Sequence, residues 1–427
     1  MESSTAKSRK SGPETGFKSL QNRQLQDKGT KTAGSGCATE FLKSTNSFMK
    51  GTKATHKTKI AFVIDQLGTG GTERQLKLLA EGLDRDRFDP SLYLLRGERD
   101  HPMKPAGAPC RVLGIQSIGS LDGLRKIWSF SRILHAEGCH VVHTFFQDAA
   151  LCGAIAGRLA RADRILVSIR DMLFWADSAS LRPLRLAVKL SHGVIVNSKA
   201  VRDKVVPITG KKPVHIIPNG IETGNGYLET SEAKQWVAEE FGLVPEVPVV
   251  VMVSNCNRTV KRVDLLIEAA PLVLKEKKVN FLIVGDGHLR PGLERRAAEL
   301  GVTGNVVFAG SRNDVPSILA GSDIFVNASD SEGFSNSLME AMRAGLAIVV
   351  SDVEGNVELI EEKINGLYFT PGSYYDLARN ILYLLKNTDT SRYLSLQAQK
   401  FVENNFSMIS MVNSYEDIYI NNKNYNG

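Results

Sequence analysis

Residues 331–358 read SEGFSNSLMEAMRAGLAIVVSDVEGNVE, and their pattern predicts loop, helix, strand and loop directly after an apolar run typical of a strand. Glu332 falls in the first loop, Ser335 is placed to cap the helix, and Glu340 falls about one turn inside it. A helix N-terminus has unpaired N–H donors and partial positive charge, so it suits a phosphate. The two glutamates then either accept hydrogen bonds from sugar hydroxyls beside that phosphate or are solvated carboxylates of an ordinary capped helix.

Strand patterns and helix patterns alternate along the rest of the chain. Such alternation predicts parallel, doubly wound sheets, in which ligands bind outside the carboxyl ends of the strands. We expect Glu354 to Glu358 to cap a further helix. The expected strands are Lys59–Asp65, Pro90–Arg96, Arg111–Ile115, Val141–Phe145, Ile165–Ile169, Val194–Asn197, Val214–Ile217, Pro248–Ser254, Phe281–Val284, Val306–Ala309, Asp323–Ala328 and Gly366–Thr370. The expected helices include Leu121–Glu137, Asp148–Arg161, Leu181–Leu190, Lys199–Val206, Asp264–Leu274, Leu377–Leu385 and 410–420.

Two other stretches suit a phosphate. The loop Gly68–Thr72 lies between a predicted strand and a predicted helix, where glycines let the backbone approach a phosphate closely. It is not the dinucleotide fingerprint, because the third glycine would fall at Glu73. Arg258 and Lys261 follow another predicted strand, and their forked guanidinium and compact ammonium either bind a diphosphate or form a surface basic cluster.

The stretch around Glu332 resembles the donor-site signature of family 4 glycosyltransferases. The similarity rests on Glu-Gly-Phe, Asn336, Leu338–Met342, Ala344-Gly345 and Ile348–Asp352. It extends over about residues 58–420 and is strongest from 247 to 370. The resemblance implies the GT-B fold of the α/β class, in which two facing Rossmann-like, doubly wound domains enclose a cleft. It also implies retaining transfer of a sugar from a nucleotide sugar to a hydroxyl.

The resemblance assigns residues to the donor. Gly70 and Gly71 would approach its diphosphate, Asn336 and Ser337 would bind phosphate at the helix start, and the loop containing Arg312 would contact the base. Backbone groups do most of the base recognition in this family. UDP-, GDP- and ADP-sugars are therefore not distinguished, and no other cofactor is expected.

The resemblance also assigns the charges at the reaction centre. Lys261 and Arg258 would neutralise the leaving diphosphate, although many relatives have the arginine five residues before the lysine, where this chain has Cys256. Glu332 would face the transferred sugar, and Glu340 would face the ribose. Together with the helix start, these cations would replace a divalent ion, so no metal is expected.

Two residues of the first half are further candidates. A lone histidine is usually structural, but His143 lies near the end of a predicted strand and resembles the family's histidine in this place, which favours a hydrogen bond to a hydroxyl of the donor sugar. Asp171 follows another strand and either reaches the acceptor or caps a helix. Asp84-Arg85-Asp86 is predicted to be a surface turn, and no nucleophile is assigned, which favours attack on the same face with the departing phosphate as base.

The expected domains follow in order along the chain. They are a disordered basic tail (1–57), an N-terminal Rossmann-like acceptor domain (58–225), a linker (226–245), a C-terminal Rossmann-like nucleotide-sugar donor domain (246–400), and a C-terminal helix that crosses back to the first domain (401–427).

Charge and composition restrict the partners. A hydrophobic content of 42% and a charged content of 23% are ordinary for globular proteins. The net charge is +7, and residues 1–59 contain twelve Lys or Arg against four Asp or Glu, so the body is nearly neutral and nucleic acid is excluded as a partner. The tail either contacts anionic lipid or is a solvated extension.

The sequence favours a cytoplasmic protein that is either free or peripheral at the inner face of the membrane. The five cysteines are odd in number and have no metal or redox spacing, which fits a reducing compartment. Leu181–Leu190 carries Arg182, Arg185 and Lys189 on one stripe, so it either lies on a membrane or is a solvated face. The expected acceptor is a sugar or a lipid-linked sugar, in envelope polysaccharide or glycolipid synthesis.

Two other functions remain open at this point. One is different chemistry on the same fold, such as a nucleotide-sugar epimerase or a phosphorylase. The other is a non-enzymatic module that binds sugar nucleotides. Such a module would not require both Lys261 and Glu332, and this chain contains both.

Overall fold

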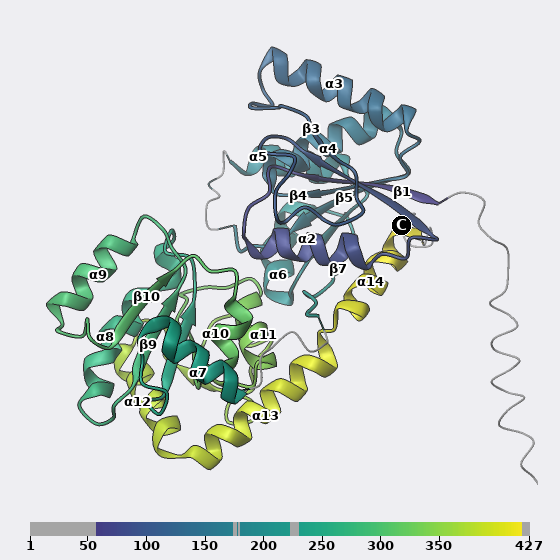
Figure 1. The fold of residues 1–427 in the computed structure, drawn as a ribbon. Coiled ribbons are helices and arrows are strands. Elements are labelled where there is room, and N and C mark those ends of the chain that lie inside the picture. Colours follow the sequence, from purple (N-terminus) through teal and green to yellow (C-terminus); the bar gives the residue numbers. More distant parts are fainter. Residues whose placement is uncertain (1–56, 174–176, 178–179, 223–229, 421–427) are drawn as a thin grey trace, which may run out of the picture. The chain divides into compact units, whose positions relative to one another are not determined.

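The computed structural model describes residues 57–173, 177, 180–222 and 230–420 (Figure 1). Apart from residue 57, the predicted basic tail lies outside these residues. Within them, every helix is too short or too polar to cross a bilayer.

The first sheet confirms the predicted doubly wound fold. Among the described residues its seven strands pair in the order β3-β2-β1-β4-β5-β6-β7, and all of them are parallel. The central strands β4 and β5 are buried along their whole length, as expected when helices cover both faces. The strands are β1 (Thr58–Ile64), β2 (Phe88–Leu94), β3 (Cys110–Val112), β4 (Val141–Phe145), β5 (Arg164–Ile169), β6 (Gly193–Val196) and β7 (Val214–Ile216).

The alternating side chains of β1 separate the two helix layers of this sheet. Ala61 and Val63 pack with α3, α4, α5 and α6, whereas Ile60, Phe62 and Ile64 pack with α2 and α14. Helix α14, the last in the described part of the chain, therefore belongs to the core of the first sheet (Figure 1). The helices are α2 (Gly71–Gly82), α3 (Leu121–Ala136), α4 (Gln147–Ala160), α5 (Leu181–Leu190), α6 (Lys199–Thr209) and α14 (Met408–Ile420).

A second parallel sheet follows α7 (Thr230–Phe241). Its six strands, counted over the described part of the chain, are ordered β10-β9-β8-β11-β12-β13. Helices again lie on both faces, α8 and α12 on one and α7, α10 and α11 on the other. The strands are β8 (Val249–Val253), β9 (Asn280–Val284), β10 (Val306–Gly310), β11 (Ile324–Asn327), β12 (Ala347–Ser351) and β13 (Leu367–Phe369). The helices are α8 (Val263–Leu274), α9 (Arg290–Glu299), α10 (Val315–Ala320), α11 (Asn336–Arg343), α12 (Tyr374–Lys386) and α13 (Thr388–Asn405), with a 3-10 turn, η1, at Thr259–Lys261.

One predicted helix is wrong. Residues 354–359 form turns, because this loop packs closely against the loop of Glu332. A Cβ on Gly355 would lie 2.4 Å from the carbonyl oxygen of Glu332, so the close approach requires glycine. Glu358 nevertheless caps a helix, since its carboxylate accepts hydrogen bonds from the N–H groups of Lys199 and Ala200 at the start of α6. In addition, α13 was not predicted, and it contains residue 400, where we placed a domain boundary.

Candidate active site

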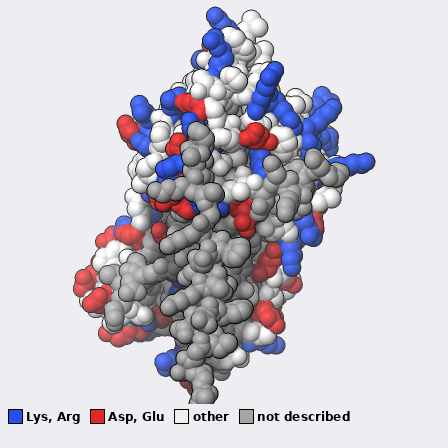
Figure 2. Space-filling model, turned by 90° about the vertical axis from the view of Figure 1, so that its right-hand side faces the viewer, with Lys and Arg blue, Asp and Glu red and all other residues white. Residues whose placement is uncertain are grey.

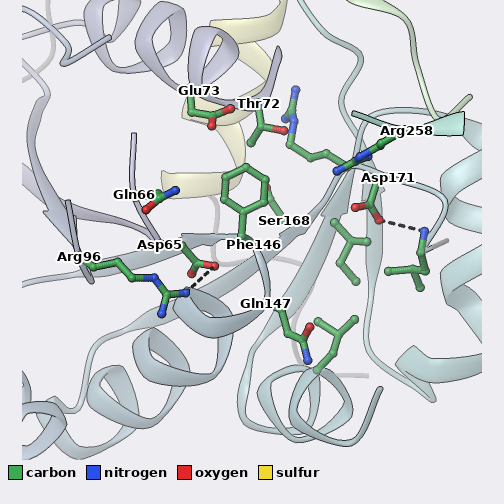
Figure 3. A pocket seen from close by; sticks show the side chains of 14 residues that line it. Asp65, Gln66, Thr72, Glu73, Arg96, Phe146, Gln147, Ser168, Asp171 and Arg258 are labelled. Carbon is green, nitrogen blue, oxygen red and sulfur yellow. Dashed lines mark hydrogen bonds and ion pairs between the residues drawn. The ribbon is translucent and has the colours of Figure 1, made fainter. Parts of the chain in front are cut away.

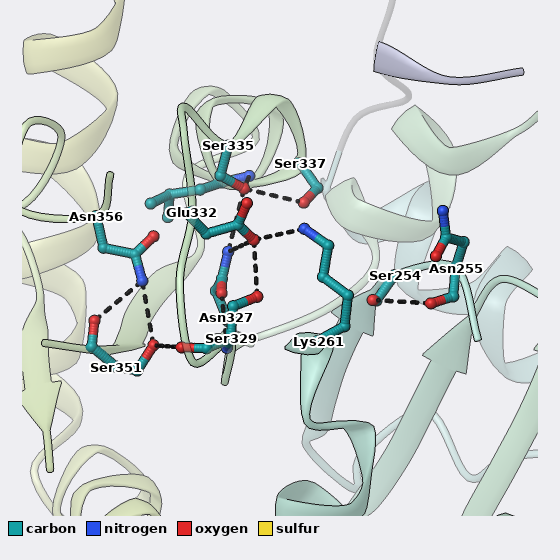
Figure 4. Close-up of polar contacts among 11 residues, drawn as sticks. Ser254, Asn255, Lys261, Asn327, Ser329, Glu332, Ser335, Ser337, Ser351 and Asn356 are labelled. Carbon is teal, nitrogen blue, oxygen red and sulfur yellow. Dashed lines mark hydrogen bonds and ion pairs between the residues drawn. The ribbon is translucent and has the colours of Figure 1, made fainter. Parts of the chain in front are cut away.

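A partly buried ion pair joins the loops after β8 and β11. Lys261 Nζ in η1 lies 2.6 Å from Glu332 Oε1, and the same oxygen accepts from Ser329 Oγ at 2.7 Å and Asn327 Nδ2 at 3.4 Å (Figure 4). Burial by itself raises the pKa of Glu332. The Lys261 charge and these hydrogen bonds outweigh that effect and hold the pKa below its usual value, so the carboxylate is ionised.

The N-terminus of α11 begins beside this pair. Ser335 caps the helix as predicted, accepting from the N–H of Leu338 at 3.3 Å. The residues Asn336 to Met339 include no acidic side chain, so the partial positive charge of the helix start is not neutralised by its own first turn.

The glycine-rich loop reaches the same helix start. A Cβ on Gly71 would lie 2.2 Å from Asn336 Nδ2, so a larger residue there would displace this amide, and Gly70 is the N-cap of α2. Asn219 Nδ2 donates to Asn336 Oδ1 at 2.5 Å. The structure thus brings together Gly70, Gly71 and Asn336, which lie far apart in the sequence.

Glu340 has a partner that the sequence did not indicate. Arg74 Nη1 in α2 donates to its Oε1 at 2.8 Å, across a separation of 266 residues. Burial raises the pKa of Glu340, and the charges of Arg74 and Arg343 lower it only in part. Ser337 Oγ lies 3.3 Å from the capping hydroxyl of Ser335.

Arg312 is held tightly by carboxylates. Its guanidinium contacts Asp314 at 2.5 Å and Glu240 at 2.8 Å, and it lies over the ring of Phe241. Asp314, and next to it Glu240, raise the pKa of Arg312 further. This arrangement fastens the loop after β10 to α7.

A cavity of about 390 Å³ opens at the carboxyl ends of β1, β4 and β5 (Figure 3). Asp171 is one of its walls, with Oδ1 accepting from the N–H of Leu173 at 2.9 Å. Arg258 contributes from the loop after β8. The cavity is also lined by Asp65, Gln66, Arg96, Phe146 and Gln147.

Asp65 organises the wall of this cavity. Its carboxylate accepts from the N–H of Ala149 at 2.6 Å in the first turn of α4, and Arg96 lies 2.7 Å from Asp148 and 3.8 Å from Asp65. Burial raises the pKa of Asp65 to about 6 in spite of the hydrogen bond from Ala149.

His143 lies on the predicted strand, but its side chain is buried and does not face the cavity at the strand's end. It is the middle residue of β4 and is fully buried, with Nδ1 2.7 Å from Tyr419 Oη and Nε2 2.7 Å from Ser168 Oγ. Burial, and next the charge of Arg170, lower its pKa to about 3, so it is neutral. Because α14 covers the ring and both nitrogens have protein partners, His143 is not available to a donor sugar, and we withdraw that role.

The sequence offered a signal for some missed residues but not for others. Asp65, Phe146 and Gln147 lie at or just beyond strand ends, where ligands of such sheets bind, and could have been nominated. Arg74 and Asn219 could not, because only the fold brings them to α11.

Asp84-Arg85-Asp86 forms the predicted turn between α2 and β2. In the part of the chain that the structure describes, no three His, Cys, Asp or Glu side chains are grouped to hold a metal.

Two parallel sheets, each covered by helices on both faces, are the architecture of the GT-B class. The profile described as "Glycosyltransferase Family 4" matches residues 69–225, and that described as "Glycosyl transferases group 1" matches residues 247–387. The chain belongs to the family 4 glycosyltransferases.

Individual relatives match most or part of its length. The chain is 25% identical over 395 residues to the UDP-Gal:alpha-D-GlcNAc-diphosphoundecaprenol alpha-1,3-galactosyltransferase of Escherichia coli, covering 86% of this chain and 98% of that protein. It is 35% identical over 161 residues to an N,N'-diacetylbacillosaminyl-diphospho-undecaprenol alpha-1,3-N-acetylgalactosaminyltransferase of Campylobacter jejuni, covering 38% and 41% of the two chains. The structure of Anabaena HepE in complex with UDP and glucose superimposes with a TM-score of 0.75 at 26% identity, covering 84% and 99%. The predicted fold and the glycosyltransferase class are thereby confirmed, and the epimerase, phosphorylase and binding-module alternatives are not favoured.

Proposed function

We propose that the protein transfers a hexose from a UDP-sugar to a hydroxyl of a sugar carried on a lipid diphosphate, with retention of the anomeric configuration. The Lys261–Glu332 pair beside the open start of α11 carries this proposal. The uridine donor is supported by the complexes of HepE, and the acceptor class by the activities of the two bacterial relatives.

The leaving diphosphate binds at the start of α11. Negative charge grows on it as the glycosidic bond breaks, and donors already oriented toward that charge stabilise the transition state. Lys261 supplies a point charge, Arg258 a forked donor, and Asn336 and Ser337 the first N–H groups of the helix. Gly70 and Gly71 have no side chain, so their backbone can approach the phosphates closely.

The two glutamates hold different ends of the donor. Glu340 accepts from the ribose hydroxyls, in competition with the guanidinium of Arg74. Glu332 orients Lys261 and faces the transferred sugar. Arg312 keeps the base-binding loop in place through Asp314 and Glu240 rather than touching the base.

The acceptor enters the cavity at the edge of the first sheet, with Asp171 in its wall. Its hydroxyl attacks the face from which the diphosphate departs, and the departing phosphate takes the proton. The cations and the helix start fulfil the neutralising role that a divalent ion has in other enzymes, so the reaction proceeds without a metal.

The direct test incubates the protein with UDP-galactose, UDP-glucose or UDP-N-acetylglucosamine and a synthetic N-acetylglucosaminyl diphosphate lipid. We expect one donor to be consumed only when the acceptor is present, an α-linked product by NMR, and undiminished rates in excess EDTA. Donor isomerised without acceptor would indicate an epimerase, and phosphate-dependent release of a sugar phosphate would indicate a phosphorylase. Activity that EDTA abolishes and magnesium or manganese restores would refute the metal-free mechanism.

An anionic membrane is the partner that presents this acceptor. The face of α3 that points away from the sheet exposes Leu121 by 83%, Leu124 by 51% and Trp128 by 57%, at the spacing of one helical stripe. Arg125 and Arg132 flank that stripe. In Figure 2, blue side chains are interspersed with white ones at the end of the molecule where Figure 1 places α3. Cationic groups around exposed Leu and Trp suit an anionic bilayer.

The membrane contact is tested with the full chain on sedimented vesicles. We expect binding to phosphatidylglycerol vesicles, weak binding to phosphatidylcholine, and at least tenfold weaker binding for a Leu121→Ser, Trp128→Ser double variant. Tyr375→Ser, which alters a side chain exposed by 63% on α12, is the matched control. Equal loss in the control, or no loss in the double variant, would exclude α3 as the contact surface.

A further inference from the structure

Phe146 has a backbone conformation that only glycine adopts readily. It is the residue between β4 and α4, with φ 69° and ψ 170°. A side chain strains the backbone in this region, and such outliers concentrate at functional sites. A phenylalanine at this position therefore indicates a role for its ring that a glycine could not fulfil.

Folding does not account for the ring. The start of α4 is capped by the carboxylate of Asp65, which accepts from Ala149, and not by residue 146. The preceding residue, Phe145, is 1% exposed and packs in the core, whereas Phe146 is 39% exposed. A glycine at this position would relieve the backbone and leave the capping bond intact.

The ring instead lies in the cavity at the edge of the first sheet. Figure 3 shows it in the middle of the cavity, among side chains from the ends of β1, β4 and β5. Polar groups from Gln66, Gln147 and Asp171 surround it, and Arg258 lies at one side. An apolar aromatic surface with amides and a carboxylate around it is suited to a sugar ring, whose C–H groups pack on the negative face of the aromatic ring while its hydroxyls bind the polar groups.

We propose that Phe146 is the platform on which the acceptor sugar stacks, and that it determines which acceptors are used. Its main-chain conformation projects the ring into the cavity from the first sheet, whereas the diphosphate-binding groups, namely the Lys261–Glu332 pair and Arg258 at the side of the cavity, belong to loops of the second sheet. The ring is thus assigned to the acceptor and not to the nucleotide sugar. This inference rests on the proposed function, because it needs a sugar acceptor.

The test compares four substitutions with the wild type in steady-state transfer to the N-acetylglucosaminyl diphosphate lipid. Phe146→Gly and Phe146→Ala remove the ring, Phe146→Leu keeps apolar bulk, and Phe146→Tyr keeps the ring. We expect the first three to raise the acceptor KM about tenfold, equivalent to about 1.4 kcal/mol, with donor KM and calorimetric UDP affinity unchanged. The tyrosine variant should remain within about twofold of the wild type.

The Gly and Ala variants form a matched pair for the strained backbone. Both lack the ring and should lose acceptor affinity alike, but the Gly variant should have the higher Tm, because the conformation has positive φ. Unchanged acceptor KM in both, or a leucine variant equal to wild type, overturns the stacking role while the proposed function stands. A loss of UDP affinity in all ring-free variants would place the ring at the donor and also overturn it. A wild type that does not use the lipid acceptor refutes the proposed function and this inference together.

Discussion

Replacing Lys261 by alanine should affect both catalysis and stability, because the ammonium is the counterion of a buried carboxylate. The side chain of Glu332 is 9% exposed, and that of Lys261 is 26% exposed. Removing one partner of a buried pair costs about 3–5 kcal/mol, and because water reaches part of the lysine we expect about 2 kcal/mol at pH 7. Loss of one electrostatic contact to the leaving diphosphate should separately reduce kcat/KM by about a hundredfold, or about 3 kcal/mol.

The pH dependence of unfolding shows whether the uncompensated charge of Glu332 causes the loss of stability in Lys261→Ala. In the wild type the pKa of Glu332 is lowered, so its contribution to stability is present above the unfolded pKa and is lost as pH falls through the folded pKa. Without Lys261, burial prevails and raises that pKa, so the ionised carboxylate destabilises the fold at neutral pH. The difference between mutant and wild type should therefore shrink as the pH falls below 5.

The assay is urea unfolding of the wild type, Lys261→Ala, Glu332→Gln and the double variant at several pH values. We expect the double variant to be more stable at pH 7 than Lys261→Ala, because it leaves no uncompensated charge, yet to be at least as inactive. If Lys261→Ala unfolds within about 0.5 kcal/mol of the wild type, or if the added Glu332→Gln restores nothing, the ion pair does not stabilise the fold. Unchanged turnover in Lys261→Ala would refute its role at the diphosphate.

Three further outcomes are expected. Glu340→Gln should weaken UDP binding in calorimetric titration and raise the donor KM, with a modest effect on kcat. Glu332→Gln should instead lower kcat more than it raises the donor KM and leave the UDP affinity nearly unchanged. The reverse order would mean that the two glutamates have each other's role. His143→Gln should retain most activity. In the wild type the pKa of His143 is lowered to about 3 in the folded state, so the free energy of unfolding should decrease as the pH falls below about 6.5, and the variant should not show this decrease. A large loss of turnover in a folded variant would restore a catalytic role for His143. Deleting residues 1–56 should keep turnover of a water-soluble acceptor within a few-fold, measured by UDP release, and loss of folding would contradict this.

The elements that form the donor side were predictable because their signals are local. Ser335 caps α11, Glu340 lies one turn inside it, and Lys261 follows β8, all as the spacing of apolar and capping residues indicated. The doubly wound fold was predictable for the same reason, since the strand and helix patterns alternate within short windows. The family signature rests on these same residues, which is why the enzyme class followed from the sequence.

The contacts between distant segments were decided only by the tertiary structure. Arg74 meets Glu340 across 266 residues, Glu358 caps α6 across 159, and Tyr419 binds His143 across 276. Each pair depends on how whole helices pack against one another, and the residue pattern within one stretch of chain does not predict that packing. For the same reason the sequence suggested a donor-binding role for His143: its place on β4 was predictable, but its burial under α14 was not. The sequence determined the elements and the class of enzyme, and the packing of those elements decided which polar side chains remain available to a substrate.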